Sequence, residues 1–161
     1  MRQTEDDRNA VVDLYAKTVW RIALSRTRRE DYAEEVFQNV FLRLFRKERS
    51  FDSEEHRNAW VIRTTLNCCK DYFATSMASD TVSLEELGDS LAVPEEKRDG
   101  LEVLLRLPAK YRVPLQLYYI EGMSAEECAA VLKLRPGTFR VRLSRGKAML
   151  KELLKGEGIY V

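Results

Sequence analysis

Apolar residues recur every three or four positions along most of the chain, and polar residues fill the positions between them. This spacing places the apolar side chains on one face of an α-helix. In the first half of the chain it predicts helices over residues 5–26, 31–47 and 57–75, with polar breaks at 26–31 and 48–55. No segment favours a strand, so we expect an all-α fold.

The helical pattern stops in the middle of the chain and then resumes. Residues 76–99 are rich in Ser, Asp and Glu, and they carry seven acidic and two basic residues. This composition is typical of a flexible linker, with one short helical turn expected at 84–87. The chain therefore divides into two predicted small helical domains, residues 1–75 and 100–161.

The second predicted domain begins with two helices, over residues 100–107 and 111–121. Pro108 ends the first because proline cannot continue the helical hydrogen bonds. Gly122 ends the second, in the position after a helix that glycine favours.

The last part of this domain has the signals of a helix-turn-helix. Ser124 can cap a helix over residues 125–132, and Glu127 stands where it would complete a capping box. Residues 133–135 form the turn. Pro136 suits the first position of a second helix, where its missing N–H costs nothing.

This second helix, over residues 137–154, has two unlike faces. One face is apolar and can be buried, with Phe139, Leu143, Gly146, Leu150 and Leu153. The opposite face is basic, with Arg140, Val141, Ser144, Arg145 and Ala148. Residues 135–155 carry seven basic residues and one acidic residue, which suits contact with base edges and phosphates in a DNA groove. The alternative is a solvated basic face on an ordinary core helix.

Composition limits the classes of protein that remain. At 161 residues, with 45% hydrophobic and 33% charged residues, the chain can fold as two small domains. It has no apolar run of the ~18 residues that a membrane span needs, and its polar start excludes a secretory signal. The net charge is only +1, so we expect another component to supply much of the affinity for nucleic acid.

Side chains suited to catalysis or metal binding are few. The cysteines are Cys68, Cys69 and Cys128, and with a single histidine, His56, they have no zinc-ligand spacing. We expect reduced, mostly structural thiols in the cytoplasm, while the adjacent Cys68 and Cys69 leave an oxidant-sensing role open. No glycine-rich phosphate loop, metal cluster or nucleophile–base pair is evident, so we expect no enzyme, no catalytic residue, no metal and no cofactor.

Three features of the first domain have two interpretations each. Leu42 lies on the polar face of its helix, either as a lone exposed leucine or as an anchor for a partner protein. Phe51 stands in the polar loop 48–55, either packed on the core or serving as a stacking platform for an unpaired base. The helix over 57–75 mixes Trp60 with basic, amide and hydroxyl groups, which suits either an amphipathic core helix or contact with single-stranded nucleic acid.

Three segments carry a resemblance to a known family. The first is EDYAEEVFQNVFLRLFR, which resembles a core-polymerase-binding helix. The second is RNAWVIRTTLNCCKDY, which resembles a promoter-melting helix with Trp60, Asn67 and Asp71 at the family's spacing. The third is residues 107–150, which resemble a C-terminal DNA-binding domain. By their order and spacing, the chain resembles bacterial RNA polymerase sigma factors of the sigma-70 type, in the extracytoplasmic-function group.

The resemblance implies a transcription initiation factor. Such a protein binds core RNA polymerase, directs it to promoters with minus-ten and minus-thirty-five elements, and helps to open the DNA. The resemblance implies that residues 1–75 bind polymerase and the minus-ten element, and that residues 100–161 bind the minus-thirty-five element. The residues that would dock on the clamp coiled coil of the largest polymerase subunit are Glu35, Gln38, Asn39, Leu42, Arg43 and Arg46.

The resemblance also implies two sets of DNA-contacting residues. The minus-ten set is Phe51, His56, Trp60, Arg63, Asn67 and Lys70. It implies a pocket for a base flipped out of the duplex, beside the loop 51–57 and including Phe51 and Asn67. The contacts in this pocket must offset the few kcal/mol that extrusion costs. The minus-thirty-five set is Arg140, Val141, Ser144 and Arg145 on base edges, with Thr138, Arg142 and Lys147 on phosphates.

Two positions depart from the family pattern, and two other functions remain open. Asn39 replaces an acidic residue in the docking motif, and Val141 replaces a polar one in a position suited to a thymine methyl.

The family implies a cytoplasmic monomer with no membrane insertion and an anti-sigma protein as a further partner. The other functions are a stand-alone helix-turn-helix regulator, which would usually dimerise, and a helical adaptor that binds an acidic protein.

Overall fold

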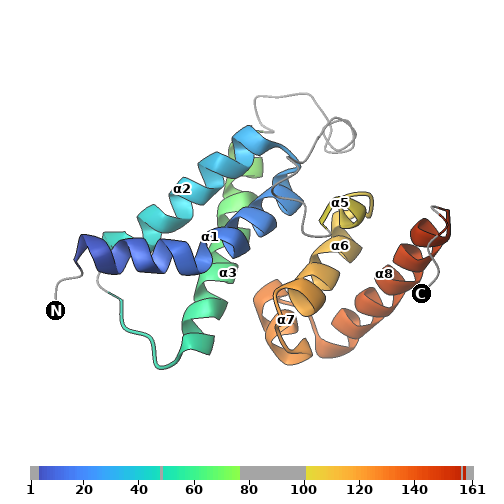
Figure 1. Ribbon diagram of the computed structural model, residues 1–161. Helices are drawn as coiled ribbons and strands as arrows, with labels where there is room; N and C mark the ends of the chain where they lie inside the picture. The colour runs from blue at the N-terminus through green and yellow to red at the C-terminus, as the bar shows by residue number, and fades with distance from the viewer. Residues whose placement is uncertain (1–3, 48, 77–100, 157, 159–161) are drawn as a thin grey trace. The chain divides into compact units, whose positions relative to one another are not determined.

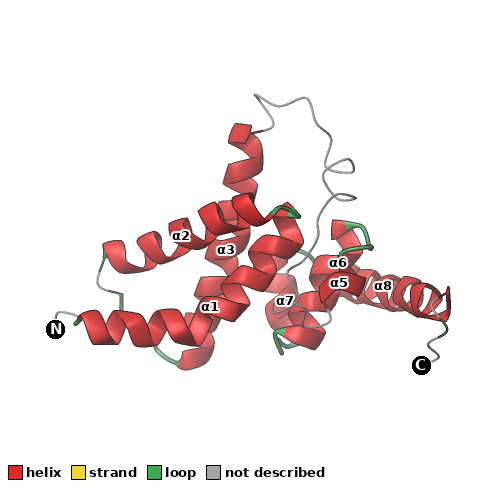
Figure 2. Cartoon of the chain, turned by 45° about the horizontal axis from the view of Figure 1, so that its top comes forward, coloured by secondary structure: helices red, strands yellow, loops and turns green. Residues whose placement is uncertain are grey.

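The computed structural model describes residues 4–47, 49–76, 101–156 and 158. Every regular element in these ranges is a helix (Figure 2), which confirms the predicted all-α fold. The helices form two compact units, which divide the chain between Leu91 and Ala92. The linker predicted at 76–99, apart from its first residue, lies outside the described residues, as does its expected helical turn at 84–87.

Three helices form the first unit (Figure 1): α1 (Glu5–Thr27), α2 (Glu30–Arg46) and α3 (Glu54–Ser76). Each of them packs against the other two. The apolar stripes predicted from the sequence meet in one core, whose fully buried members include Val19, Leu24, Val36, Val40, Val61 and Ile62. Burial of these stripes stabilises the unit and leaves the polar faces of α2 and α3 in solvent.

The ends of these helices follow local caps. Thr4 and Asp7 form a capping box at the start of α1, with both bonds at 3.1 Å. Arg28 adopts a left-handed conformation with φ of 58° and ends α1, so the break before α2 is narrower than the predicted 26–31. The predicted start of α3 at Arg57 was wrong by three residues, because the Ser53 hydroxyl accepts the His56 N–H at 3.1 Å and caps the helix earlier.

The second unit contains α5 (Leu101–Leu104), α6 (Ala109–Leu115), the π-helical turn η2 (Gln116–Ile120), α7 (Ala125–Leu132) and α8 (Pro136–Gly156). Of the predicted boundaries, those of α7 and the start of α8 at Pro136 are confirmed. The helix predicted over 100–107 was too long, because after Leu104 the N–H groups of Arg106 and Leu107 bond carbonyls only three residues back.

The helix predicted over 111–121 differs from the structure in two respects. It begins at Ala109, because the Pro108 carbonyl accepts the N–H groups of Tyr111 and Arg112. It also ends in a π-helical turn, in which the Glu121 N–H donates to the Gln116 carbonyl five residues back at 2.9 Å. Gly122 follows with φ of 74°, which confirms its predicted role in ending the helix.

Gly146 lies where α8 crosses α6, and it should not tolerate a side chain. A Cβ there would lie 3.1 Å from Leu115 Cδ1 and 3.2 Å from the Tyr111 carbonyl oxygen. We expect Gly146→Ala to destabilise the unit by about 1–2 kcal/mol, because overpacking outweighs the gain in helix propensity. Thermal unfolding followed by circular dichroism measures this change.

Gly137 provides the matched control for this prediction. It lies in the same helix, but a Cβ there would meet no atom within 4 Å. Gly137→Ala should therefore leave the unfolding midpoint unchanged or raise it slightly. Equal midpoints for the two alanine variants would contradict the tight packing at Gly146.

Candidate functional site

The helix α8 has two unlike faces, as the sequence predicts, but Leu143, Leu150 and Leu153 of the apolar face are only half-buried. Phe139 is completely buried and Gly146 is buried with it, so this side packs on the unit's core. The side chains on the opposite face are all exposed: Arg140, Val141, Ser144, Arg145 and Ala148. Thr138 and Lys147 are exposed too, while Arg142 is half-buried with an unpartnered Nε. The exposed basic row is therefore available to a DNA groove.

The turn before α8 is held by local bonds. Ser124 Oγ accepts the Glu127 N–H at 3.1 Å, which supplies the first half of the predicted capping box. The reciprocal bond from the Glu127 side chain is absent among the described residues, so the prediction of a complete capping box was wrong. Lys133 takes a left-handed conformation with φ of 56°, and this sharp change of direction lets α7 pack against α8.

An acidic side chain lies beside the basic row. The Glu126 carboxylate is 3.8 Å from the Arg140 guanidinium, and both side chains are largely exposed. Such a pair adds little to stability. It joins two helices, so the helical pattern of α8 alone gave no signal for it.

One face of α2 carries the residues expected to bind polymerase. Glu35, Gln38, Asn39, Leu42 and Arg46 are all exposed. Leu42 is 67% exposed and has five polar neighbours on its face. Arg43 is half-buried and pairs with Asp71 of α3 at 3.0 Å, so the structure ties this face to α3.

One face of α3 carries most of the expected minus-ten residues. His56, Trp60, Arg63, Asn67 and Lys70 follow one another at spacings of four and three residues, which places them in one row along the helix. His56, Arg63, Asn67 and Lys70 are exposed, and Trp60 is half-buried. The Phe51 ring packs against the start of this row, with ring centroids 5.5 Å from His56 and 5.9 Å from Trp60.

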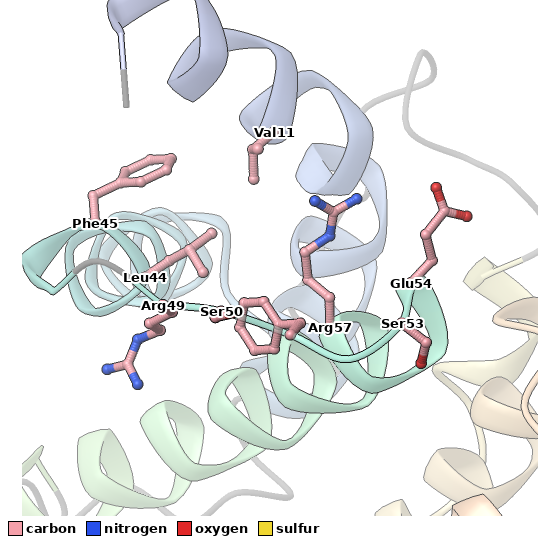
Figure 3. Close-up of a pocket in the computed structure, with 9 residues that line it drawn as sticks. Val11, Leu44, Phe45, Arg49, Ser50, Ser53, Glu54 and Arg57 are labelled. Atoms are coloured by element: carbon pink, nitrogen blue, oxygen red, sulfur yellow. The ribbon is translucent and has the colours of Figure 1, made fainter. Parts of the chain in front are cut away.

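A cavity of about 470 Å³ opens beside the loop before α3 (Figure 3). It is lined by Val11, Leu44, Phe45, Arg49, Ser50, Phe51, Ser53, Glu54 and Arg57. Phe51 therefore lies in the wall of this cavity. Asn67 does not line this cavity, because it lies about two turns of α3 beyond Trp60. The structure thus brings Phe51, but not Asn67, to the cavity.

A second cavity, of about 980 Å³, lies between the α2 face and the α3 row. Its lining residues are Arg8, Asn39, Leu42, Arg43, Phe45, Arg46, Arg49, Trp60 and Thr64. Arg49 lies in the walls of both cavities and stacks on Trp60, with its guanidinium carbon 4.5 Å from the ring centroid. The resemblance implies a pocket beside the loop 51–57, at whose end Arg57 stands. Helical periodicity gives no signal for Arg8 or Arg49 at these cavities, because it does not show which loops and helices meet.

The three thiols are buried and should react slowly. Desolvation raises the pKa of Cys69 and of Cys128 to about 12, and it also raises the pKa of Cys68. We expect iodoacetamide to label the folded protein about 100-fold more slowly than the denatured protein at neutral pH, because little thiolate forms. Mass spectrometry of the labelled protein measures this rate, and rapid formation of a Cys68–Cys69 disulfide in peroxide would contradict it.

The same pKa shifts predict the direction of pH dependence. In the unfolded chain these thiols lose their protons near the ordinary pKa of 9.0, whereas Cys69 and Cys128 stay neutral in the folded protein up to about 12. The unfolded state then binds fewer protons than the folded state. The free energy of unfolding should therefore fall as the pH rises above 9.

Metal-binding clusters and membrane-spanning helices can both be looked for in the structure. Within the described ranges, no three His, Cys, Asp or Glu side chains gather where they could hold a metal ion. In the same part of the chain, no helix combines the length and apolar character needed to cross a membrane.

Comparison with known proteins places both units. A family model described as Sigma-70 region 2 matches residues 11–78, and one described as Sigma-70, region 4 matches residues 101–150. The chain is 26% identical to the ECF RNA polymerase sigma factor SigW of Bacillus subtilis, over 90% of this chain and 87% of that protein. It is also 26% identical to SigM of the same organism, over 89% and 92% of the two chains.

Solved structures have the same fold. The sigma factor RpoE, solved in complex with the anti-sigma factor NepR from Bartonella quintana, aligns with a TM-score of 0.73 and 26% identity, over 92% of this chain and 97% of that one. CnrH, solved with the cytosolic domain of CnrY, aligns with a TM-score of 0.65 and 24% identity, over 95% and 90% of the two chains.

Proposed function

We propose a division of work between the two units of this chain, which belongs to the extracytoplasmic-function group of the sigma-70 family. Members of this family direct RNA polymerase to promoters and are not enzymes, and the same holds for this chain. The first unit docks on core polymerase and holds the unwound minus-ten strand. The second unit contacts the minus-thirty-five duplex. The protein acts in the cytoplasm as a free monomer until it meets polymerase.

The α2 face docks on the clamp coiled coil of the largest polymerase subunit. The observation that carries this assignment is Leu42, an exposed leucine that a docked partner would cover. The surrounding Glu35, Gln38, Asn39 and Arg46 supply the polar rim that such an interface needs. Arg43, held by Asp71, supports the same rim.

The α3 row and the neighbouring cavity hold the minus-ten strand. Phe51 and Trp60 offer aromatic rings for stacking, and His56, Arg63, Asn67 and Lys70 offer hydrogen bonds and positive charge along one line. The 470 Å³ cavity beside Phe51 is the place for a base extruded from the duplex. Asn67, further along the row, contacts the strand outside that cavity.

The basic face of α8 enters the major groove at the minus-thirty-five element. Arg140, Val141, Ser144 and Arg145 contact base edges, and Val141 suits a thymine methyl. Thr138, Arg142 and Lys147 hold phosphates. RpoE, the solved relative at 26% identity, was captured with the anti-sigma factor NepR, which supports an anti-sigma protein as a partner here.

Run-off transcription with bacterial core polymerase on a pool of promoter fragments tests this division of work. We expect discrete transcripts only when the protein is added, and aligned start sites should give both promoter elements. If the protein binds core polymerase but no transcripts appear, the cause is either a promoter missing from the pool or a docking contact altered by Asn39. Failure of both binding and transcription would favour a stand-alone helix-turn-helix regulator.

A further inference from the structure

Arg57 is the first residue of the segment that resembles a promoter-melting helix, and it lines the cavity beside Phe51. Figure 3 shows its guanidinium directed towards Val11 of α1, across the space that Phe45 also faces. Its Nε donates to the Tyr15 hydroxyl at 3.0 Å, and the guanidinium carbon lies 5.4 Å from the centroid of the Tyr15 ring. Tyr15 is only 5% exposed, so it is a fixed support.

This support leaves part of the guanidinium available. The bond to Tyr15 uses Nε, and among the described residues Arg57 makes no other hydrogen bond or ion pair. The two terminal nitrogens are therefore free to donate into the cavity as a parallel pair. A guanidinium that is already held in place loses little conformational entropy when it binds a ligand.

Besides Arg49, Ser50 and Ser53, the lining holds apolar side chains and one carboxylate that suit a base. Val11, Leu44, Phe45 and Phe51 supply apolar walls for a planar ring. Glu54 adds a carboxylate, which repels a phosphate but accepts a hydrogen bond from the amino group of a base. The cavity thus offers apolar side chains for one face of a base, together with a donor pair and an acceptor.

We infer that Arg57, positioned by Tyr15, selects the extruded base by donating from both terminal nitrogens to two adjacent acceptors. Guanine has such a pair at O6 and N7, and cytosine has one at O2 and N3, whereas adenine and thymine have none. Both guanine and cytosine also carry an amino group for Glu54. This inference rests on the proposed minus-ten function of the cavity.

Promoter selection by the holoenzyme tests it. Core polymerase is loaded with wild type, Arg57→Gln, Arg57→Lys or Tyr15→Phe, and each holoenzyme transcribes a library with a fixed minus-thirty-five element and a randomised minus-ten element. Sequencing of the transcripts gives the base preference at each position. Thermal unfolding of each variant shows whether it folds, and Lys17→Gln, on an exposed position of α1, is the matched control.

We expect wild type to prefer guanine or cytosine at one minus-ten position, and the library shows which. Arg57→Gln should lower that preference about tenfold, and Arg57→Lys should do so as well because lysine lacks the planar donor pair. Tyr15→Phe should lower it less, and Lys17→Gln not at all. Preferences at the other positions should stay as in wild type.

Three results would overturn the inference. One is a wild-type preference for adenine or thymine throughout the minus-ten element. Another is an unchanged preference in both Arg57 variants, or an equal loss of transcription on every library member, which would make Arg57 merely structural. In all three cases transcription by wild type leaves the proposed function intact. If wild type starts no discrete transcripts, the proposed function fails and the inference falls with it.

Discussion

Replacing Leu42 by aspartate should weaken binding to core RNA polymerase about 100-fold, because a central anchor side chain is lost and a charge enters the interface. Leu42 is 67% exposed in the free protein, among the polar side chains of the α2 face. Anchor residues of this kind contribute about 2 kcal/mol or more to an interface, and burying an unpaired carboxylate adds a further cost. The affinity of labelled protein for purified core polymerase, measured by fluorescence anisotropy, gives the change directly.

Leu14 provides the matched control for this variant. It is 59% exposed, it also lies within a helix, and it belongs to none of the proposed contact sets. Leu14→Asp therefore carries a similar cost in helix propensity and solubility but should leave the affinity for core polymerase within about twofold of wild type. If the two variants lose equal affinity, or if Leu42→Asp loses none, α2 does not dock on polymerase through this face.

Local signals explain why the helix-turn-helix could be predicted almost residue by residue. Ser124, Gly122 and Pro136 each act on the backbone beside them, so their effects can be worked out without knowledge of the rest of the fold. The alternation of buried and exposed residues along α8 follows in the same way. The π-helical turn at Gln116–Ile120 could not be predicted, because apolar spacing does not distinguish it from an ordinary helical turn.

The cavities of the first unit could not be predicted, because they are made by contacts between distant parts of the chain. The bond from Arg57 to Tyr15 joins residues 42 positions apart, and the bond from Arg43 to Asp71 joins residues 28 positions apart. Helical periodicity shows which face of a helix is buried but not which side chain it meets. The minus-ten pocket expected around Phe51 and Asn67 was therefore placed by resemblance, beside the loop 51–57, and the bond that fixes Arg57 at the cavity was identified only from the structure.

The second large effect is expected in the recognition helix. Replacing both Arg140 and Arg145 by alanine should lower holoenzyme binding to a promoter with its minus-thirty-five element about 100-fold, since each bidentate base contact contributes roughly 1–3 kcal/mol. Both side chains are exposed on the face of α8 away from the core, so their loss should leave the fold intact. Promoter binding by filter retention, compared between intact and scrambled minus-thirty-five elements, isolates this contribution.

The decisive comparison removes the same charge elsewhere on the same helix. Lys151 and Lys155 are exposed basic residues of α8 beyond the proposed contact set, and Lys155 lies 3.5 Å from Glu152. Changing both to alanine should lower binding only a few-fold, and equally on intact and scrambled elements, because charge attracts phosphates without selecting bases. Equal losses in the two double variants would make the basic row a general electrostatic surface. Unchanged promoter-specific transcription in the arginine variant would instead favour a helix that binds an acidic protein. A loss confined to the arginines and to the intact element is the result that base recognition by α8 requires.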